Sequence, residues 1–254
     1  MRQQLPASLT CRHAALVLAA ALAFCLLAGC SSSQRVDLAL DGSGAARVEI
    51  RLSPVLASYL RDLTATVTGV EPAANSPLFD IGSLREAFAR YPGITLVDAS
   101  TPRPDMLLLS VKFANAGSLL SRDGAGPEEF VTFTNRDGLR TLSIRLDRAV
   151  VAELLRLTPL AGSAAGSVLL PPAGTQMSPE EYTSYLAWAL ESYASENDVK
   201  KAIRGSRVDV TVTVAGSILN AEGGSVSGRS AAFSVPVVKL LTLQSPLVYA
   251  LTFR

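Results

Sequence analysis

The sequence predicts an α+β fold, with a mostly antiparallel, hairpin-connected sheet and helices packed on one face. Two pairs of segments alternate apolar and polar residues around a short glycine-containing turn, a pattern typical of hairpins with one buried face. Other segments place apolar residues three and four positions apart after a serine or an aspartate, which predicts capped amphipathic helices. We therefore expect about eight or nine strands and five or six helices.

The N-terminal 29 residues have the pattern of a bacterial lipoprotein signal peptide. Arg2 and Arg12 precede residues 14–28, which are uncharged and mostly apolar. This run of about 15 residues is shorter than the roughly 18–20 that span a bilayer. It ends in a lipobox formed by Leu27, Ala28, Gly29 and Cys30. We expect cleavage before Cys30 and membrane anchoring through lipid on that cysteine. The alternative is a short uncleaved anchor helix with an incidental cysteine.

The lipobox also predicts the domain organisation. We expect a signal peptide over residues 1–29, a polar lipidated tether over 30–35 and a single α+β envelope domain over 36–254. A subdivision of that domain near 158–177 is left open. No aspartate follows Cys30, which favours the outer membrane if the host is diderm.

The expected mature chain lacks the side chains of most common catalytic and metal-binding chemistries. The only histidine of the sequence, His13, lies in the leader, as do Cys11 and Cys25. Triad catalysis, His- or Cys-ligated metals and internal disulfides are thereby excluded. No nucleophile elbow and no phosphate-binding loop is present. We expect no catalytic residue, no metal and no cofactor, with a carboxylate-dependent hydrolase as a distant alternative.

The charge balance excludes one class of partner. The leader holds two of the 23 basic residues and none of the 22 acidic ones, so the mature chain would carry a formal charge of −1. Nucleic-acid binding requires a marked basic excess, so we expect no nucleic-acid partner.

The first expected elements form a hairpin followed by a helix. Residues 36–40 and 48–52 alternate apolar and polar side chains around the turn at 41–44. Ser53 then precedes a proline, a pattern typical of a helix N-cap, and the helix is expected over 54–63.

The next segments are a linker, a helix and two strands. Residues 64–77 read as a linker, and Ser83 with Glu86 predicts a capping box for a helix that ends near 91. Strands are expected over 94–99 and 106–113, and a short helix over 116–120.

A second hairpin is expected in the middle of the chain. Strands over 130–134 and 139–146 flank Asp137 and Gly138, which supply the positive φ angles of a tight turn. Asp147 then predicts the N-cap of a further helix.

The C-terminal part begins with the clearest helix start in the chain. Ser178 and Glu181 form a capping box around Pro179 for a helix that continues to about 193. The elements expected after it are a helix over 198–204, strands over 208–214, 230–235 and 247–253, a glycine-rich turn over 220–228 and a short pairing segment over 240–243.

The segment over 157–179 carries no charged side chain, and three interpretations stay open. It includes Val168, Leu169 and Leu170 directly before two prolines. It is a connector tucked against the core, the lid or wall of an apolar cavity that holds a lipid, or a membrane contact. Long structureless loops are commonly functional or disordered, so the segment is a candidate site.

Two side-chain patterns have both a structural and a functional interpretation. The first is an aromatic stripe that includes Tyr182, Tyr185 and Trp188, which indicates either a core helix or the wall of a ligand site. We take Trp188 as a candidate pocket or membrane contact. The second consists of arginines that alternate with apolar residues, namely Arg47, Arg51, Arg140 and Arg145. They indicate a solvated sheet face or a site for anionic headgroups.

Three stretches resemble the LppM-type bacterial lipoprotein domain. They are residues 36–44, which read VDLALDGSG, residues 107–113, which read LLLSVKF, and the strand and turn over 208–228. The resemblance in pattern spans most of the mature chain. It implies a compact α+β domain at the cell envelope, with a hydrophobic pocket for lipid.

These observations predict a membrane-anchored, non-catalytic protein that binds or places a hydrophobic or amphiphilic ligand at the cell envelope. Its expected partners are the membrane, through lipidated Cys30, and a lipid or similar ligand. The alternative is a structural subunit of an envelope assembly, with another envelope protein as its partner.

Overall fold

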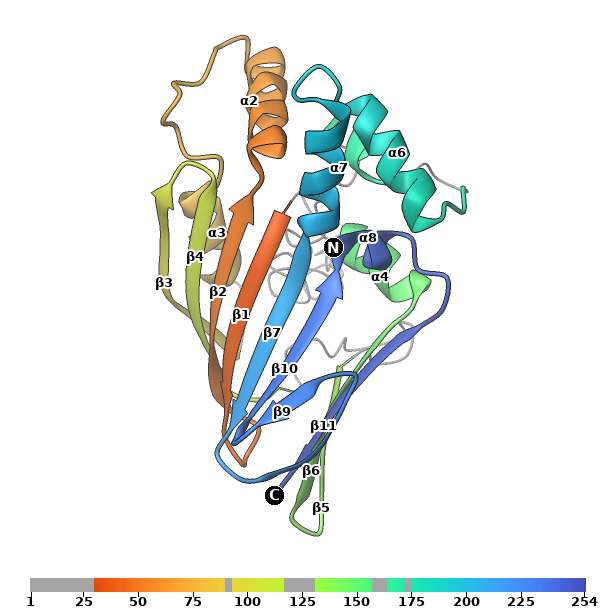
Figure 1. Cartoon of the computed structure of the whole chain (residues 1–254). Helices are drawn as coiled ribbons and strands as arrows, with labels where there is room; N and C mark the ends of the chain where they lie inside the picture. The colour runs from red at the N-terminus through yellow and green to blue at the C-terminus, as the bar shows by residue number, and fades with distance from the viewer. Residues whose placement is uncertain (1–29, 90–92, 117–130, 157–163, 172–174) are drawn as a thin grey trace, which may run out of the picture.

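The computed structural model describes residues 30–89, 93–116, 131–156, 164–171 and 175–254 (Figure 1). These residues form an α+β fold, which confirms the predicted class. The strands divide into a seven-stranded sheet and a four-stranded sheet rather than one sheet. A split of this kind lets both sheets bury their apolar faces in a shared core.

The seven-stranded sheet has the order β3-β4-β2-β1-β7-β10-β9. Its strands are β1 (Cys30–Leu38), β2 (Gly44–Leu52), β3 (Ile94–Arg103), β4 (Met106–Phe113), β7 (Arg207–Val214), β9 (Ser225–Ser227) and β10 (Ser230–Pro236). The pair β1–β7 is parallel, whereas the other pairs of this sheet are antiparallel. Because β1 and β7 are far apart in sequence, they meet only when the whole domain folds.

The turn between β1 and β2 lies where the sequence predicts it. The Ala39 amide donates to the Ser43 carbonyl at 2.8 Å, and the Asp41 carboxylate accepts from the Ser43 amide at 2.9 Å. Gly44 has no room for a side chain, because a Cβ there would lie 2.2 Å from the Asp37 carbonyl oxygen. This close approach explains the glycine at the first position of β2.

The four-stranded sheet has the order β5-β6-β11-β8. Its strands are β5 (Val131–Arg136), β6 (Leu139–Leu146), β8 (Ile218–Glu222) and β11 (Leu247–Phe253). The predicted turn between β5 and β6 is confirmed, since Asp137 has a φ of 52° and Gly138 a φ of 78°.

The helices are α2 (Pro54–Thr68), α3 (Ile81–Ala89), α4 (Arg148–Arg156), α5 (Ala164–Leu169), α6 (Pro179–Ala189), α7 (Glu196–Gly205) and α8 (Val237–Leu241). The predicted caps Ser53, Asp147 and Ser178 each accept a hydrogen bond from a first-turn amide. The predicted cap at Ser83 is wrong, because Asp80 accepts from the Ser83 amide at 3.1 Å and α3 begins directly after it.

The main core lies between the inner face of the seven-stranded sheet and the helices, and it also includes Leu146 and Leu247 of the four-stranded sheet. It joins side chains of the sheet, such as Ile50 and Leu107, to side chains of α2, α5, α6 and α7, such as Leu56, Leu169 and Leu186. Figure 1 shows α2, α6 and α7 at one end of the molecule, which we call the helical end. The β1–β2 and β5–β6 turns lie at the opposite end, which we call the turn end, whereas the β3–β4 turn lies at the helical end.

Several expected segments differ from the structure. The expected linker over 64–77 begins inside α2, which continues to Thr68, and the uncharged segment over 157–179 contains α5. The tether expected over 30–35 instead opens β1, because backbone pairing with β2 and β7 on both sides outweighs the low strand propensity of its serines. The pairing segment expected over 240–243 falls at α8, where Val237 and Leu240 are buried at helical spacing. The turn expected over 220–228 contains β9 and the end of β8. The helix expected over 116–120 lies outside the described residues beyond Ala116.

Candidate functional site

Cys30, the predicted lipid attachment residue, lies at the first position of β1 and faces the core. It pairs with Leu52 of β2 and is 0% exposed. The next inward-facing residues of β1 are Ser32 and Gln34, both buried, with the Gln34 amide donating to the Ser32 hydroxyl at 3.5 Å. The start of β1 is therefore a polar strip inside an apolar core. The lipobox residues Leu27, Ala28 and Gly29 lie outside the described residues.

The three apolar residues of the uncharged segment belong to the core or its edge. Leu169 ends α5 and is 0% exposed, whereas Val168 and Leu170 are half-buried. The Tyr182 hydroxyl donates to the Leu169 carbonyl, which joins α5 to α6. Burial of Tyr182 raises the pKa of its phenol. In the described part of the segment, the connector interpretation thus fits the environment of Leu169.

Trp188 lies in different surroundings from Leu169. Its side chain is 67% exposed at the end of α6. Its ring lies 6.3 Å from that of Tyr185, whose ring lies 6.4 Å from that of Tyr182. The three rings form a row from the buried Tyr182 to the exposed Trp188. Sequence spacing predicted the stripe, and the structure shows that its outer member faces solvent.

A second aromatic contact joins the turn after α6 to α2. The ring of Tyr193 meets that of Tyr59 edge-on, with centroids 5.5 Å apart. The Tyr193 hydroxyl also donates to an Asp62 carboxylate oxygen at 2.5 Å. This hydrogen bond, burial and the negative charge of Asp62 raise the pKa of Tyr193 to about 12.

We expect the Asp62→Asn substitution to lower the pKa of Tyr193 toward its ordinary value of about 10, because it removes the charged acceptor. The contribution of this pair to stability is full below a pH of about 10 and is lost as the pH rises through about 12. NMR titration with labelled tyrosine side chains measures this pKa directly. Asp98→Asn on β3 is the matched control and should leave it unchanged. An unchanged Tyr193 pKa in the Asp62→Asn protein would contradict the assignment.

An open hollow lies at the turn end, away from the aromatic row. It has a volume of about 570 Å³. It is lined by the ends of β1, β4 and β7, the start of β2 and the turn before β10. Its residues include Asp37, Ala45, Lys112, Thr213 and Arg229. Lys112 and Arg229 outnumber the single acidic residue, Asp37, so the hollow is basic. Sequence analysis missed it because these strands come together only in the sheet.

The described residues contain no group of three or more His, Cys, Asp or Glu side chains placed to hold a metal ion. No helix in the same part of the chain combines the length and the apolar character needed to cross a membrane.

Comparisons with known proteins yield a structural likeness. No family model matches the chain, and no curated protein matches it. Among solved structures, the NMR structure of the folded domain of LppM from Mycobacterium tuberculosis matches over 89% of each chain, with a TM-score of 0.37 and 7% sequence identity. This solved structure is of the same domain type that the sequence pattern resembles.

Proposed function

We propose that this chain is a lipid-anchored, non-catalytic envelope protein whose helical end engages amphiphilic molecules of the membrane. The observation that carries this proposal is the exposed Trp188, whose ring lies beside that of Tyr185 at an interplanar angle of 41°. Tyr and Trp combine an apolar ring with a polar edge, which suits them to the boundary between headgroups and acyl chains. The leader and lipobox support the same location.

Other exposed apolar side chains support a membrane contact at the helical end. Val67 is 74% exposed in the last turn of α2, and Val70 is 67% exposed just after it. Figure 1 places the end of α2 and the turn between α6 and α7 on the same side of the molecule. In such a contact Leu169 stays buried in the core, where it packs with side chains of the helices.

Anchoring through Cys30 requires this residue to leave the core. A cysteine with no exposed surface cannot carry two acyl chains into a bilayer from its place in the core. In the lipidated protein, the first residues of β1 therefore separate from β2 and β7. The cost is moderate, because Ser32 and Gln34 are the polar part of this core. The released segment would leave from the helical end, where β1 begins (Figure 1).

The fluorescence of Trp188 tests the membrane contact, because the chain contains one tryptophan. The full chain is reconstituted into vesicles that contain lipids with a quencher at headgroup depth. We expect the loss of about half or more of the emission, since interfacial side chains lie about 5–10 Å into the headgroup region.

The matched control moves the single tryptophan to another face. It combines Trp188→Phe with Leu219→Trp, on the half-exposed β8 position. This protein should keep its emission in the same vesicles. Equal quenching of the two proteins, or no quenching in either, would contradict a membrane contact at Trp188.

A second candidate is a structural subunit of an envelope assembly. The observation that favours it is the edge strand β3, which carries Val97 at 57% exposure. Open edges with apolar side chains pair readily with strands of other chains. Crosslinking from position 97 in the intact envelope would recover a defined partner under this alternative and none under the first proposal.

A further inference from the structure

Two arginines lie directly opposite each other on the outer face of the seven-stranded sheet. The register pairs Arg35 of β1 with Arg47 of β2, and both side chains are exposed. The same row continues to Ser110 of β4 on one side and to Thr211 of β7 on the other. The row therefore presents two guanidinium groups between two hydroxyl groups.

Such a pair is unfavourable for the sheet by itself, because like charges directly opposite on neighbouring strands repel. Within the described residues, neither Arg35 nor Arg47 makes a hydrogen bond or an ion pair through its side chain. A repulsive pair of this kind is eased by an anion that binds both members.

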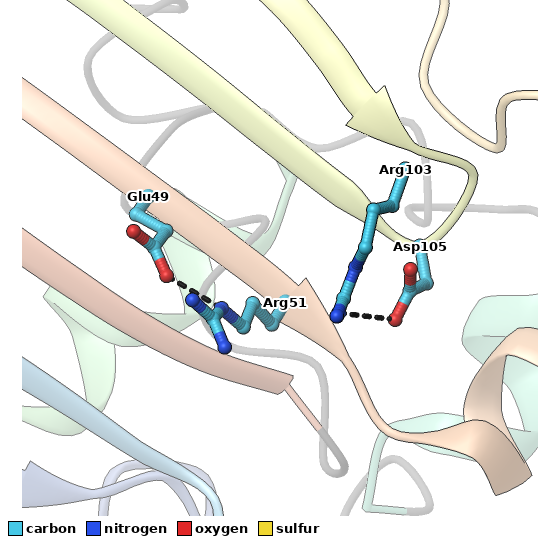
Figure 2. A network of polar contacts seen from close by, with 4 residues as sticks. All are labelled: Glu49, Arg51, Arg103 and Asp105. Carbon is cyan, nitrogen blue, oxygen red and sulfur yellow. Dashed lines mark hydrogen bonds and ion pairs between the residues drawn. The ribbon is translucent and has the colours of Figure 1, made fainter.

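Of the carboxylates on this face, Glu49 and Asp209 are engaged with other groups. Two others lie near the arginine pair: Asp98 pairs with Ser110 in the same row, and Asp37 lies two positions along β1 from Arg35. Figure 2 shows Glu49 turned toward Arg51 on the same strand, with 2.5 Å between oxygen and nitrogen. The same view shows Arg103 paired with Asp105 at 3.0 Å across the β3–β4 turn. On β7, the carboxylate of Asp209 accepts from the Ser234 hydroxyl at 2.5 Å.

The hollow at the turn end extends the basic character of this face. Its residues Asp37, Ala45, Lys112 and Thr213 lie two positions along each strand from Arg35, Arg47, Ser110 and Thr211, on the same side of the sheet. Lys112 and Arg229 thus add two cations beside the arginine pair, against the single carboxylate of Asp37.

We propose that Arg35 and Arg47 bind a phosphate group, with the hydroxyls of Ser110 and Thr211 as neighbouring donors and with the rest of the ligand in the hollow. A guanidinium presents two parallel N–H donors that match phosphate oxygens, and two of them form a clamp. Arg35 lies five residues from Cys30, or about 17 Å along the strand, so this site is separate from the helical end. The inference does not depend on the proposed membrane contact.

Inorganic pyrophosphate is the first probe, titrated by calorimetry into the full chain in a non-ionic detergent. We expect saturable binding by the natural chain. The affinity should be at least about tenfold lower in a protein that carries both Arg35→Gln and Arg47→Gln. The affinity should fall as salt rises. Arg145→Gln removes one exposed positive charge from the four-stranded sheet and is the matched control, with binding unchanged.

Thermal unfolding without phosphate separates a binding role from a structural one. We expect the doubly substituted protein to be at least as stable as the natural chain, because the repulsion is gone. Added pyrophosphate should stabilise the natural chain and not the variant. A variant that unfolds earlier without any probe would overturn the inference, since the arginines would then serve the fold.

A second probe, glycerophosphoglycerol, distinguishes the source of the phosphate. This soluble phosphodiester carries the headgroup chemistry of a membrane phospholipid. Tighter binding of the diester supports a lipid headgroup, and tighter binding of pyrophosphate supports a free phosphate compound. The inference is overturned if neither probe binds the natural chain better than the doubly substituted protein, or if Arg145→Gln weakens binding equally.

Discussion

Replacing Leu169 by alanine is expected to lower the free energy of unfolding by about 2–5 kcal/mol, the range for leucine truncation in packed cores. Leu169 is 0% exposed and lies in the main core with side chains of α2 and α6. For a domain of this size, the loss corresponds to a fall in melting temperature of about 4–20 °C. Chemical denaturation and calorimetry measure both quantities.

Leu219→Ala is the matched control, because the Leu219 side chain is 50% exposed on β8. Its effect on the free energy of unfolding should stay within about 0.5 kcal/mol. An unchanged stability in the Leu169→Ala protein would contradict the core assignment. It would favour instead a direct role of the 168–170 segment in holding a ligand.

Replacing Cys30 by alanine is expected to abolish acylation and to release the domain from washed membranes. The expected mature chain has no other cysteine, so no second residue can accept the diacylglyceryl group. Because two or three acyl chains anchor a protein firmly, their removal should change membrane retention almost completely. Metabolic labelling with an alkyne fatty acid, followed by fractionation, measures acylation and retention in one sample.

Cys25→Ala is the control for this experiment, because Cys25 lies within the expected leader. It should keep both the label and the membrane retention. Fatty-acid label that persists in the Cys30→Ala protein would rule out Cys30 as the acceptor. Retention without label would instead support the short uncleaved anchor helix.

Local patterns predicted the elements that depend on neighbouring residues. The hairpin turn at Asp137 and Gly138 needs positive φ angles, and the capping box of Ser178 satisfies amides three residues away. Both signals act over a few positions and are readable before the fold is known. The helix α8 was missed because five residues are too few to separate helical from strand periodicity.

For the candidate sites too, local spacing predicted some features and tertiary packing decided the others. Spacing placed Trp188 on the flank of a helix, but only packing decided that its ring is exposed while Leu169 is buried. Arg35 was assigned to a tether, so its position opposite Arg47 could not be foreseen. Lys112 and Arg229 come from separate parts of the chain and meet at the hollow through the sheet order.

The sequence by itself determined the α+β class, most turns and caps, the predicted lipidation signal and an expected mature chain with no histidine and one cysteine. These properties follow from composition and from contacts within a few residues. Tertiary structure decided the division into two sheets, the parallel pairing of β1 with β7 and the burial of Cys30. They depend on backbone hydrogen bonds and side-chain packing between distant segments, whose partners no local pattern specifies.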